Sequence, residues 1–166
     1  MSEFHFRRPE LMIDDQAELL EIIAGQQVMT LALCQDNRPY LVTVDFAYDP
    51  AENCFFFHSA DHGKKIDYLH SNPLVWGQVV EDRGYVVDRC DHAYRSVHFA
   101  GRAEFVEEAD EKRRILALMI DRFEPDPAAV KARLLTDLKV AAITIGRIRA
   151  ETLTGKQNAL ADAPSP

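Results

Sequence analysis

The sequence predicts a mainly β (α+β) fold, a small antiparallel barrel with helices at its ends. Segments rich in β-branched and aromatic residues recur along the chain, and clusters of turn residues separate them. The first two turns, residues 35–39 and 49–53, are too short for the crossovers that parallel strands need. Other segments repeat apolar residues at helical spacing. About six antiparallel strands of this kind are expected to curl into a barrel, because closure removes exposed strand edges.

The first helix is expected to begin after Asp14 or Asp15 and to end at Gly25. Glu18 follows Asp15 at the spacing of a capping box. The apolar residues of this segment share one face at helical spacing: Leu19, Ile22 and Ile23. We expect this face to pack against the sheet.

Three strands are predicted to follow the first helix as an antiparallel meander: Val28–Cys34, Tyr40–Tyr48 and Cys54–Ser59. Polar turn residues join each strand to the next. Three consecutive phenylalanines, which are strong strand formers, lie in the third strand.

Strands and helices are predicted to alternate in the second half of the chain. The expected strands are Leu74–Glu81, extended or paired by Tyr85–Val87, then Tyr94–Val106 and Leu138–Arg149; the expected helices are Glu107–Phe123 and Asp126–Leu135. Gly101 lies inside a predicted strand and indicates a bulge or a close approach of two backbones. We expect one domain over residues 1–156 and a frayed tail over residues 157–166.

The junction that follows the strand Cys54–Ser59 has the composition of an anion site. Turn residues at 61–63 precede a helix predicted over Lys64–Leu69. A helix N-terminus presents unpaired N–H groups and about half a positive charge, which attract phosphate. Four groups are expected to converge there: the Ser59 hydroxyl, the Gly63 backbone, and the ammonium groups of Lys64 and Lys65. The alternative is an ordinary strand–turn–helix connection with two solvated lysines.

The composition limits the classes of partner. The formal net charge of -8 and the pI near 5.2 argue against nucleic acid or an anionic membrane surface as the main partner. No apolar run approaches the roughly 20 residues of a membrane span, and the charged start of the chain lacks the apolar core of a secretory signal. We therefore expect a cytoplasmic protein. The three cysteines, Cys34, Cys54 and Cys90, lack CxxC spacing, so reduced thiols are expected rather than disulfides or structural zinc.

Four motifs resemble a known family by their order and spacing: RPYLVTVDFAYD, FFFHSADHGKKIDYLHSNP, SVHFAGRAEFVE and ITIGRIRAETLTGK. Together they resemble the pyridoxamine 5'-phosphate oxidase-like FMN-binding split barrels, over residues 9–156. The second motif is most similar to the nitroimidazole-resistance proteins of that group. The resemblance implies a six-stranded antiparallel split β-barrel with flanking helices, a homodimer, and FMN in a groove at the dimer interface.

The resemblance also implies which residues contact FMN. His58 and Ser59 match the strand end that lies beside the ribityl chain and the phosphate. The strand that contacts the isoalloxazine ring falls on Val42, Thr43, Val44 and Asp45.

Lys64 and Lys65 match the family's basic phosphate-binding pair, at the place that the electrostatic argument indicates independently. Two departures are visible. Lys64 stands where pyridoxamine-phosphate oxidases have arginine, and Gly63 replaces a hydroxyl residue, so bidentate contact and a side-chain donor are lost. The residues that hold pyridoxal phosphate in those oxidases find no match, which argues against that substrate.

His58 is the expected proton donor, because histidine has the side-chain pKa nearest neutrality. The alternative role for His58 is a hydrogen bond to the backbone at a strand end. Two function classes stay open: an FMN-dependent oxidoreductase that reduces a small electrophile such as a nitroaromatic, and a non-enzymatic protein of the same fold that binds flavin or haem. The sequence contains no GxGxxG loop, so electrons are expected from transiently bound NAD(P)H or from a partner reductant.

Two other groups of polar residues carry weaker signals. Asp88, Cys90, Asp91 and His92 are metal-ligand types, but their spacing fits no zinc pattern, so we expect a solvated loop and no metal. His98 lies in a predicted strand and is expected to be a hydrogen-bonded residue of the barrel wall.

Overall fold

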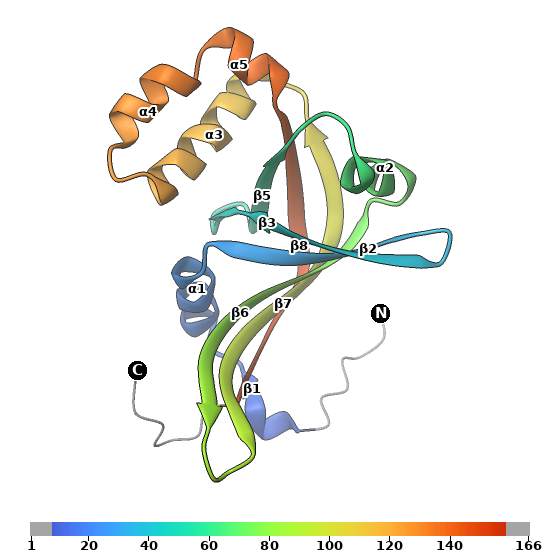
Figure 1. Cartoon of the computed structure of the whole chain (residues 1–166), viewed down its shortest axis with the longest axis vertical. Coiled ribbons are helices and arrows are strands. Elements are labelled where there is room, and N and C mark those ends of the chain that lie inside the picture. The colour runs from blue at the N-terminus through green and yellow to red at the C-terminus, as the bar shows by residue number, and fades with distance from the viewer. Residues whose placement is uncertain (1–7, 159–166) are drawn as a thin grey trace.

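The computed structural model describes residues 8–158 (Figure 1). The helices are α1 Gln16–Gly25, α2 Lys64–Ser71, α3 Ala109–Phe123, α4 Pro127–Leu134 and α5 Asp137–Ala142, with a short 3-10 turn at Pro9–Leu11. The strands are β1 Met12–Ile13, β2 Val28–Gln35, β3 Arg38–Asp45, β4 Ala47–Asp49, β5 Cys54–Ser59, β6 Leu74–Val86, β7 Asp91–Val106 and β8 Thr144–Asn158. None of these helices is long and apolar enough to cross a membrane.

All strand pairs in the described chain are antiparallel, and they form one sheet in the order β3-β2-β6-β7-β8-β5-β4, with β1 paired to β8. The sheet curls, but its two ends do not pair with each other, although β3 and β4 follow one another in the chain. Phe46, which joins them, is fully buried. Six long strands therefore form a split barrel, and the predicted fold class is confirmed.

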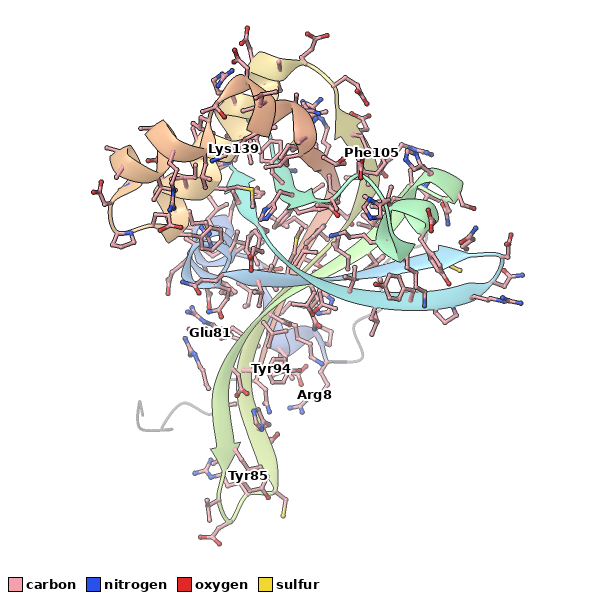
Figure 2. The ribbon with its side chains drawn as sticks, turned by 45° about the horizontal axis from the view of Figure 1, so that its top comes forward. Arg8, Glu81, Tyr85, Tyr94, Phe105 and Lys139 are labelled. Carbon is pink, nitrogen blue, oxygen red and sulfur yellow. The ribbon has the colours of Figure 1, made fainter. Side chains whose placement is uncertain are left out.

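The molecule is extended, with helices at one end and a long strand pair at the other. Helices α3, α4 and α5 lie together at the top of Figure 1, while the β6–β7 hairpin projects at the bottom. Tyr85 lies near the far end of this hairpin (Figure 2). The site predicted from the sequence lies where β5 leads into α2, in the upper part of Figure 1, with α2 to the right of the three helices.

The core explains why β5 is so apolar. Phe55 and Phe57 pack into the cluster inside the barrel, and the Phe55 ring stacks on Phe99 with 3.9 Å between centroids. Phe56 points the other way, into a second cluster with Ile115 of α3. Both faces of β5 are therefore buried, and this strand fixes the position of the junction that follows it.

A bulge or a close approach of two backbones was expected at Gly101, and the structure shows both. The register of β7 on β8 shifts between Ala100 and Gly101, which is a β-bulge. A Cβ atom at Gly101 would lie 2.2 Å from the carbonyl oxygen of Arg149. The two backbones touch here, so only glycine fits.

The prediction of a strand over Leu138–Arg149 is wrong in its first part. Residues 137–142 form α5, with Thr136 as N-cap, and β8 begins only at Thr144. Leu138 is exposed while Val140 is buried against α3. A run of six residues is too short for periodicity to separate helix from strand, and Arg113 fixes the start of α5 by bonding to Leu135 and Asp137.

Three smaller predictions also change. The strand predicted over Tyr40–Tyr48 is divided at Phe46 into β3 and β4. The Asp15 carboxylate accepts from the N–H of Ala17, as an N-cap should, but the Glu18 carboxylate bonds to Arg95 instead of closing a capping box. Residues 157–158 belong to β8 rather than to a tail, and residues 159–166 lie outside the described chain.

Arg95 joins α1 to the base of the β6–β7 hairpin. Its buried guanidinium donates to Glu21 at 2.9 Å and Glu18 at 3.4 Å on α1, and to Glu81 on β6. The hydrogen bonds that Arg95 donates to Glu81 lower the pKa of the Glu81 carboxyl. A group with a lowered pKa stabilises the fold above its ordinary pKa, so this contribution is lost as the pH falls through the lowered value.

Arg95→Met is expected to lower the free energy of unfolding by about 2–3 kcal/mol, because it leaves Glu81 without its buried partner. Urea titration of both proteins measures the difference. Arg83→Met is the matched control, since Arg83 bonds to the same carboxylate at 3.2 Å from an exposed position, and it should cost less than about 1 kcal/mol. Equal losses for the two variants would contradict the structural role given to Arg95.

Candidate functional site at the β5–α2 junction

The N-terminus of α2 leaves room for an anion. Gly63 is the N-cap, with φ of 112° and ψ of 167°, a conformation that favours glycine. No side chain caps the helix there, and the Gly63 carbonyl accepts from Ile66 at 2.8 Å and from Asp67 at 3.0 Å. Lys64 and Lys65 come before the first residue that donates a helical hydrogen bond, so their N–H groups are free to bind a ligand. Gly63 is therefore placed where its backbone could take part in an anion site.

Lys64 and Lys65 lie over aromatic rings instead of extending into solvent. The Lys64 ammonium is 4.3 Å from the Tyr40 ring centroid and 5.5 Å from that of Tyr68. The Lys65 ammonium is 5.4 Å from the Phe57 centroid. These contacts with ring faces are favourable for cations and restrict where the ammonium groups lie.

Lys65 is a half-buried cation that has no acidic partner in the described part of the chain. Its pKa is lowered from the ordinary lysine value because burial disfavours the charged form. Within residues 8–158, no carboxylate forms an ion pair with Lys64 or Lys65. A bound anion would supply the missing counter-charge. A phosphate at the adjacent helix N-terminus would supply this charge and would also accept hydrogen bonds from the free N–H groups of α2.

β3 runs past this junction as an edge strand. In the described chain β3 pairs only with β2, so half of its backbone N–H and C=O groups face away from the sheet. Five residue steps of about 3.4 Å place Tyr40 and Asp45 about 17 Å apart along the strand. Tyr40, which contacts Lys64, marks the phosphate end, and Asp45 marks the other end.

The side chains predicted to contact a flavin ring divide between the two faces of β3. Val42 and Val44 pack partly against the barrel core, while Thr43 and Asp45 are exposed on the opposite face. The Thr43 hydroxyl lies 3.3 Å from that of Thr30 on β2. Any contact that this strand makes along its edge therefore comes mainly from its backbone.

His58 and Asp45 line a cavity of about 430 Å³ that the sequence did not reveal. The rest of its wall comes from α3, α4, α5 and the segments between them, including Met119, Phe123 and Leu135. His58 and Ser59 pair through the backbone of β5 with Ile145 and Thr144 of β8. His58 is exposed, so its ring is accessible from this cavity.

The predicted site residues thus form two groups. Gly63, Lys64 and Lys65 come together at the α2 N-terminus, and Asp45 and His58 come together at the cavity. β3 connects the two groups. The contacts of Tyr40 and Tyr68 with Lys64 were not predicted from the sequence. The local signal for them is that Tyr68 lies one helical turn after Lys64.

The two remaining groups of polar residues are placed as follows. Asp88 and Cys90 are exposed at the tip of the β6–β7 hairpin, and His92 bonds to Asp82 at 2.7 Å. Within residues 8–158, no group of three or more possible ligands is placed to hold a metal ion. His98 is half-buried, and its ring lies 3.3 Å from the Gln78 amide. Burial and the nearby charge of Lys156 lower its pKa.

The fold recurs in solved structures. The flavocytochrome Anf3 from Azotobacter vinelandii has a TM-score of 0.82 at 16% identity, over 99% of this chain and 77% of that chain. A Bacteroides thetaiotaomicron protein assigned to 5-nitroimidazole antibiotic resistance has a TM-score of 0.75 at 23% identity, over 88% and 86%. The FAD and haem binding protein from Mycobacterium smegmatis has a TM-score of 0.74 at 18% identity, over 89% and 73%. At these identities the likeness shows the fold alone.

Sequence comparison gives the family. An uncharacterized protein of Rhizobium meliloti (strain 1021) is 35% identical over 60 residues, which span 36% of this chain and only 38% of that protein. The family model for pyridoxamine 5'-phosphate oxidase matches residues 15–157, nearly the whole chain and all of the site described above. The chain therefore belongs to the pyridoxamine 5'-phosphate oxidase family, as its four motifs predict.

Proposed function

We propose that this protein is a flavoprotein that binds FMN through its phosphate at the α2 N-terminus and reduces a small electrophile, such as a nitroaromatic, beside His58. The observation that carries the proposal is Lys65, a half-buried cation without an acidic partner in the described chain, next to an uncapped helix N-terminus. Of the common flavin forms, FMN ends in the phosphomonoester that this site fits. Flavin-free protein titrated with FMN tests the assignment, and failure to bind would overturn it.

The structural neighbours support flavin over an unrelated phosphate compound. Anf3 is a flavocytochrome, and the Mycobacterium smegmatis protein binds FAD and haem. Family membership adds support, because the family model covers both β3 and the β5–α2 junction. The proposal therefore places the phosphate on Lys64, Lys65 and the Gly63 backbone, and the flavin ring along the edge of β3.

The protein's own residues have three tasks in this proposal. When bound, FMN supplies hydride or single-electron transfer. Lys64 and Lys65 hold the phosphate, and the backbone of Val42–Asp45 orients the ring. His58 donates a proton toward the cavity, because it is the titratable ring that the cavity exposes. Electrons come from NAD(P)H bound transiently or from a partner reductant, since the sequence carries no GxGxxG loop.

The affinity for FMN is expected to fall at alkaline pH. The fall should begin at a lower pH than it would if Lys65 had the pKa of an ordinary lysine. Burial lowers the pKa of Lys65, so its charge is present at neutral pH and is lost as the pH rises through that lowered value. Lys65→Arg should shift the loss to higher pH, because guanidinium stays protonated. FMN titrations between neutral and alkaline pH measure both curves. Identical alkaline losses in the two proteins would rule out Lys65 as the titrating group.

The protein is expected to be a homodimer. Several large apolar side chains are exposed on neighbouring strands: Val28 on β2, Leu41 on β3, and Leu74, Trp76 and Val80 on β6. A hollow of about 470 Å³ beside Leu74 and Trp76 adds to this apolar surface. Burial against a second copy would remove it from water.

Sedimentation at micromolar concentration should give twice the chain mass, and Leu74→Glu should shift the species toward monomer, because it places a charge in the proposed interface. Leu138→Glu, the same change at an exposed leucine of α5 outside this surface, is the control and should leave the mass unchanged. A monomer that still binds FMN would contradict the proposal of a two-chain site.

A further inference from the structure

The cavity beside His58 and Asp45 combines an apolar wall with a small number of polar groups. Leu116, Met119 and Ile120 of α3 form part of the wall, with Leu135 and Ile143 from the segments that flank α5. Its volume of about 430 Å³ lies in the range of small-molecule sites. Such a wall favours a compact apolar ligand. The polar groups determine whether the cavity accepts a positive or a negative charge on that ligand.

The charges around the cavity are unbalanced. Lys139 is the one lysine among the lining residues; its ammonium keeps its charge and is held at the Arg133 carbonyl of α4 by a hydrogen bond of 2.7 Å. Figure 2 shows Lys139 on the helical part of the molecule. Arg122, also on α3, is not among the lining residues, and its guanidinium donates to the carbonyls of Ile23, Ala24 and Gln26.

Two carboxylates share the lining with this one ammonium group. In the part of the chain that the structure describes, neither Asp45 nor Glu124 forms an ion pair, and both line the cavity. Glu124 also follows the last residue of α3, where the carbonyl end of the helix adds a partial negative charge. The lining therefore carries two carboxylates and one ammonium group, and the carbonyl end of α3 adds to the negative side.

We propose that this cavity selects a compact apolar, aromatic-sized molecule that carries a cationic nitrogen, and that it excludes molecules with an anionic group. The identification of this ligand as the substrate rests on the proposed function, which places the flavin ring beside Asp45 and His58. The apolar body lies on the α3 and α5 wall, and the cationic nitrogen lies toward Asp45 and Glu124. A phosphorylated substrate would meet the same two carboxylates and be repelled.

Two probes with the same ring and opposite charge test the selection: 2-naphthylmethylammonium and 2-naphthoate. Calorimetric titration of the full chain at neutral pH and low salt, with and without FMN, gives both affinities. The cation should bind at least about tenfold more tightly than the anion, and the difference should shrink as salt screens the carboxylates. Equal affinities, or tighter binding of the anion, would overturn the proposal.

Three variants locate the effect. Glu124→Gln should reduce the preference for the cation about three- to tenfold, whereas Glu108→Gln, at the N-cap of the same helix, should leave it unchanged. Ala142→Trp puts a large side chain at an exposed lining position and should abolish binding of the cation. Binding that survives Ala142→Trp would place the probe elsewhere and refute the cavity assignment.

The same titrations separate the two proposals. If FMN binds but the cation shows no preference, the charge selection fails while the flavin proposal stands. If the cation binds selectively but FMN does not bind, the cavity assignment stands and the flavin proposal fails.

Discussion

Lys65→Ala is expected to weaken FMN binding about 10- to 150-fold, because a charge-assisted contact to phosphate contributes about 1.5–3 kcal/mol. Riboflavin, which has the same ring and ribityl chain but no phosphate, should bind the variant nearly as well as it binds the parent protein. The measurement is a pair of flavin fluorescence titrations on flavin-free protein. The differential effect is large because Lys65 is half-buried beside the free N–H groups of α2.

Lys131→Ala is the control for a general loss of positive charge. Lys131 pairs with Asp121 at 2.6 Å on the helical part of the chain and contacts no predicted flavin residue. It should change neither affinity by more than about twofold, as expected for an exposed ion pair. Equal losses of FMN and riboflavin in Lys65→Ala would mean that the substitution damages the fold and would remove the phosphate assignment.

His58→Ala is expected to slow reoxidation of reduced flavin by a nitroaromatic acceptor by about 10²- to 10⁴-fold, the usual contribution of a general acid. The FMN affinity should stay within about tenfold, because a neutral hydrogen bond contributes only about 0.5–1.5 kcal/mol. Stopped-flow absorbance gives the rate, and the titration gives the affinity. The two responses differ because His58 lines the cavity and lies apart from the lysine pair.

His70→Ala serves as the matched control, since His70 is exposed on α2 and its ring packs on Phe105 at 4.8 Å between centroids. It should alter neither rate nor affinity. Normal turnover in His58→Ala would assign His58 to the wall of the cavity, with the proton coming from solvent. If the parent protein shows no acceptor-dependent reoxidation, a flavin carrier replaces the oxidoreductase proposal.

The sequence predicts the β5–α2 junction well because its signals are local. Phe55, Phe56 and Phe57 require burial on both faces of a strand, and Gly63 ends the turn before α2. α2 ends at Ser71, two residues after the predicted end at Leu69, and Asn72 is its C-cap. Each of these features depends on neighbours within a few positions, so residue type and spacing suffice.

The cavity and the strand order depend on contacts between distant residues. The division of the predicted strand at Phe46 places β3 and β4 at opposite ends of the sheet, which no local pattern indicates. α5 forms where Arg113 of α3 bonds to Leu135 and Asp137, and its wrong assignment as a strand concealed the cavity wall. The contact between the Lys64 ammonium and an aromatic ring likewise requires Tyr40 of β3, which is distant from Lys64 in the sequence. These features required the structure.

The most direct test of the flavin assignment is to identify the small molecule that accompanies the full-length protein through purification. The visible spectrum and the mass of the ligand released by heat are measured together, and the stripped protein is then titrated with FMN and with haem. We expect a flavin spectrum, FMN as the released species, and saturation at one FMN per chain. A haem spectrum without flavin, or stripped protein that takes up haem and not FMN, would contradict it.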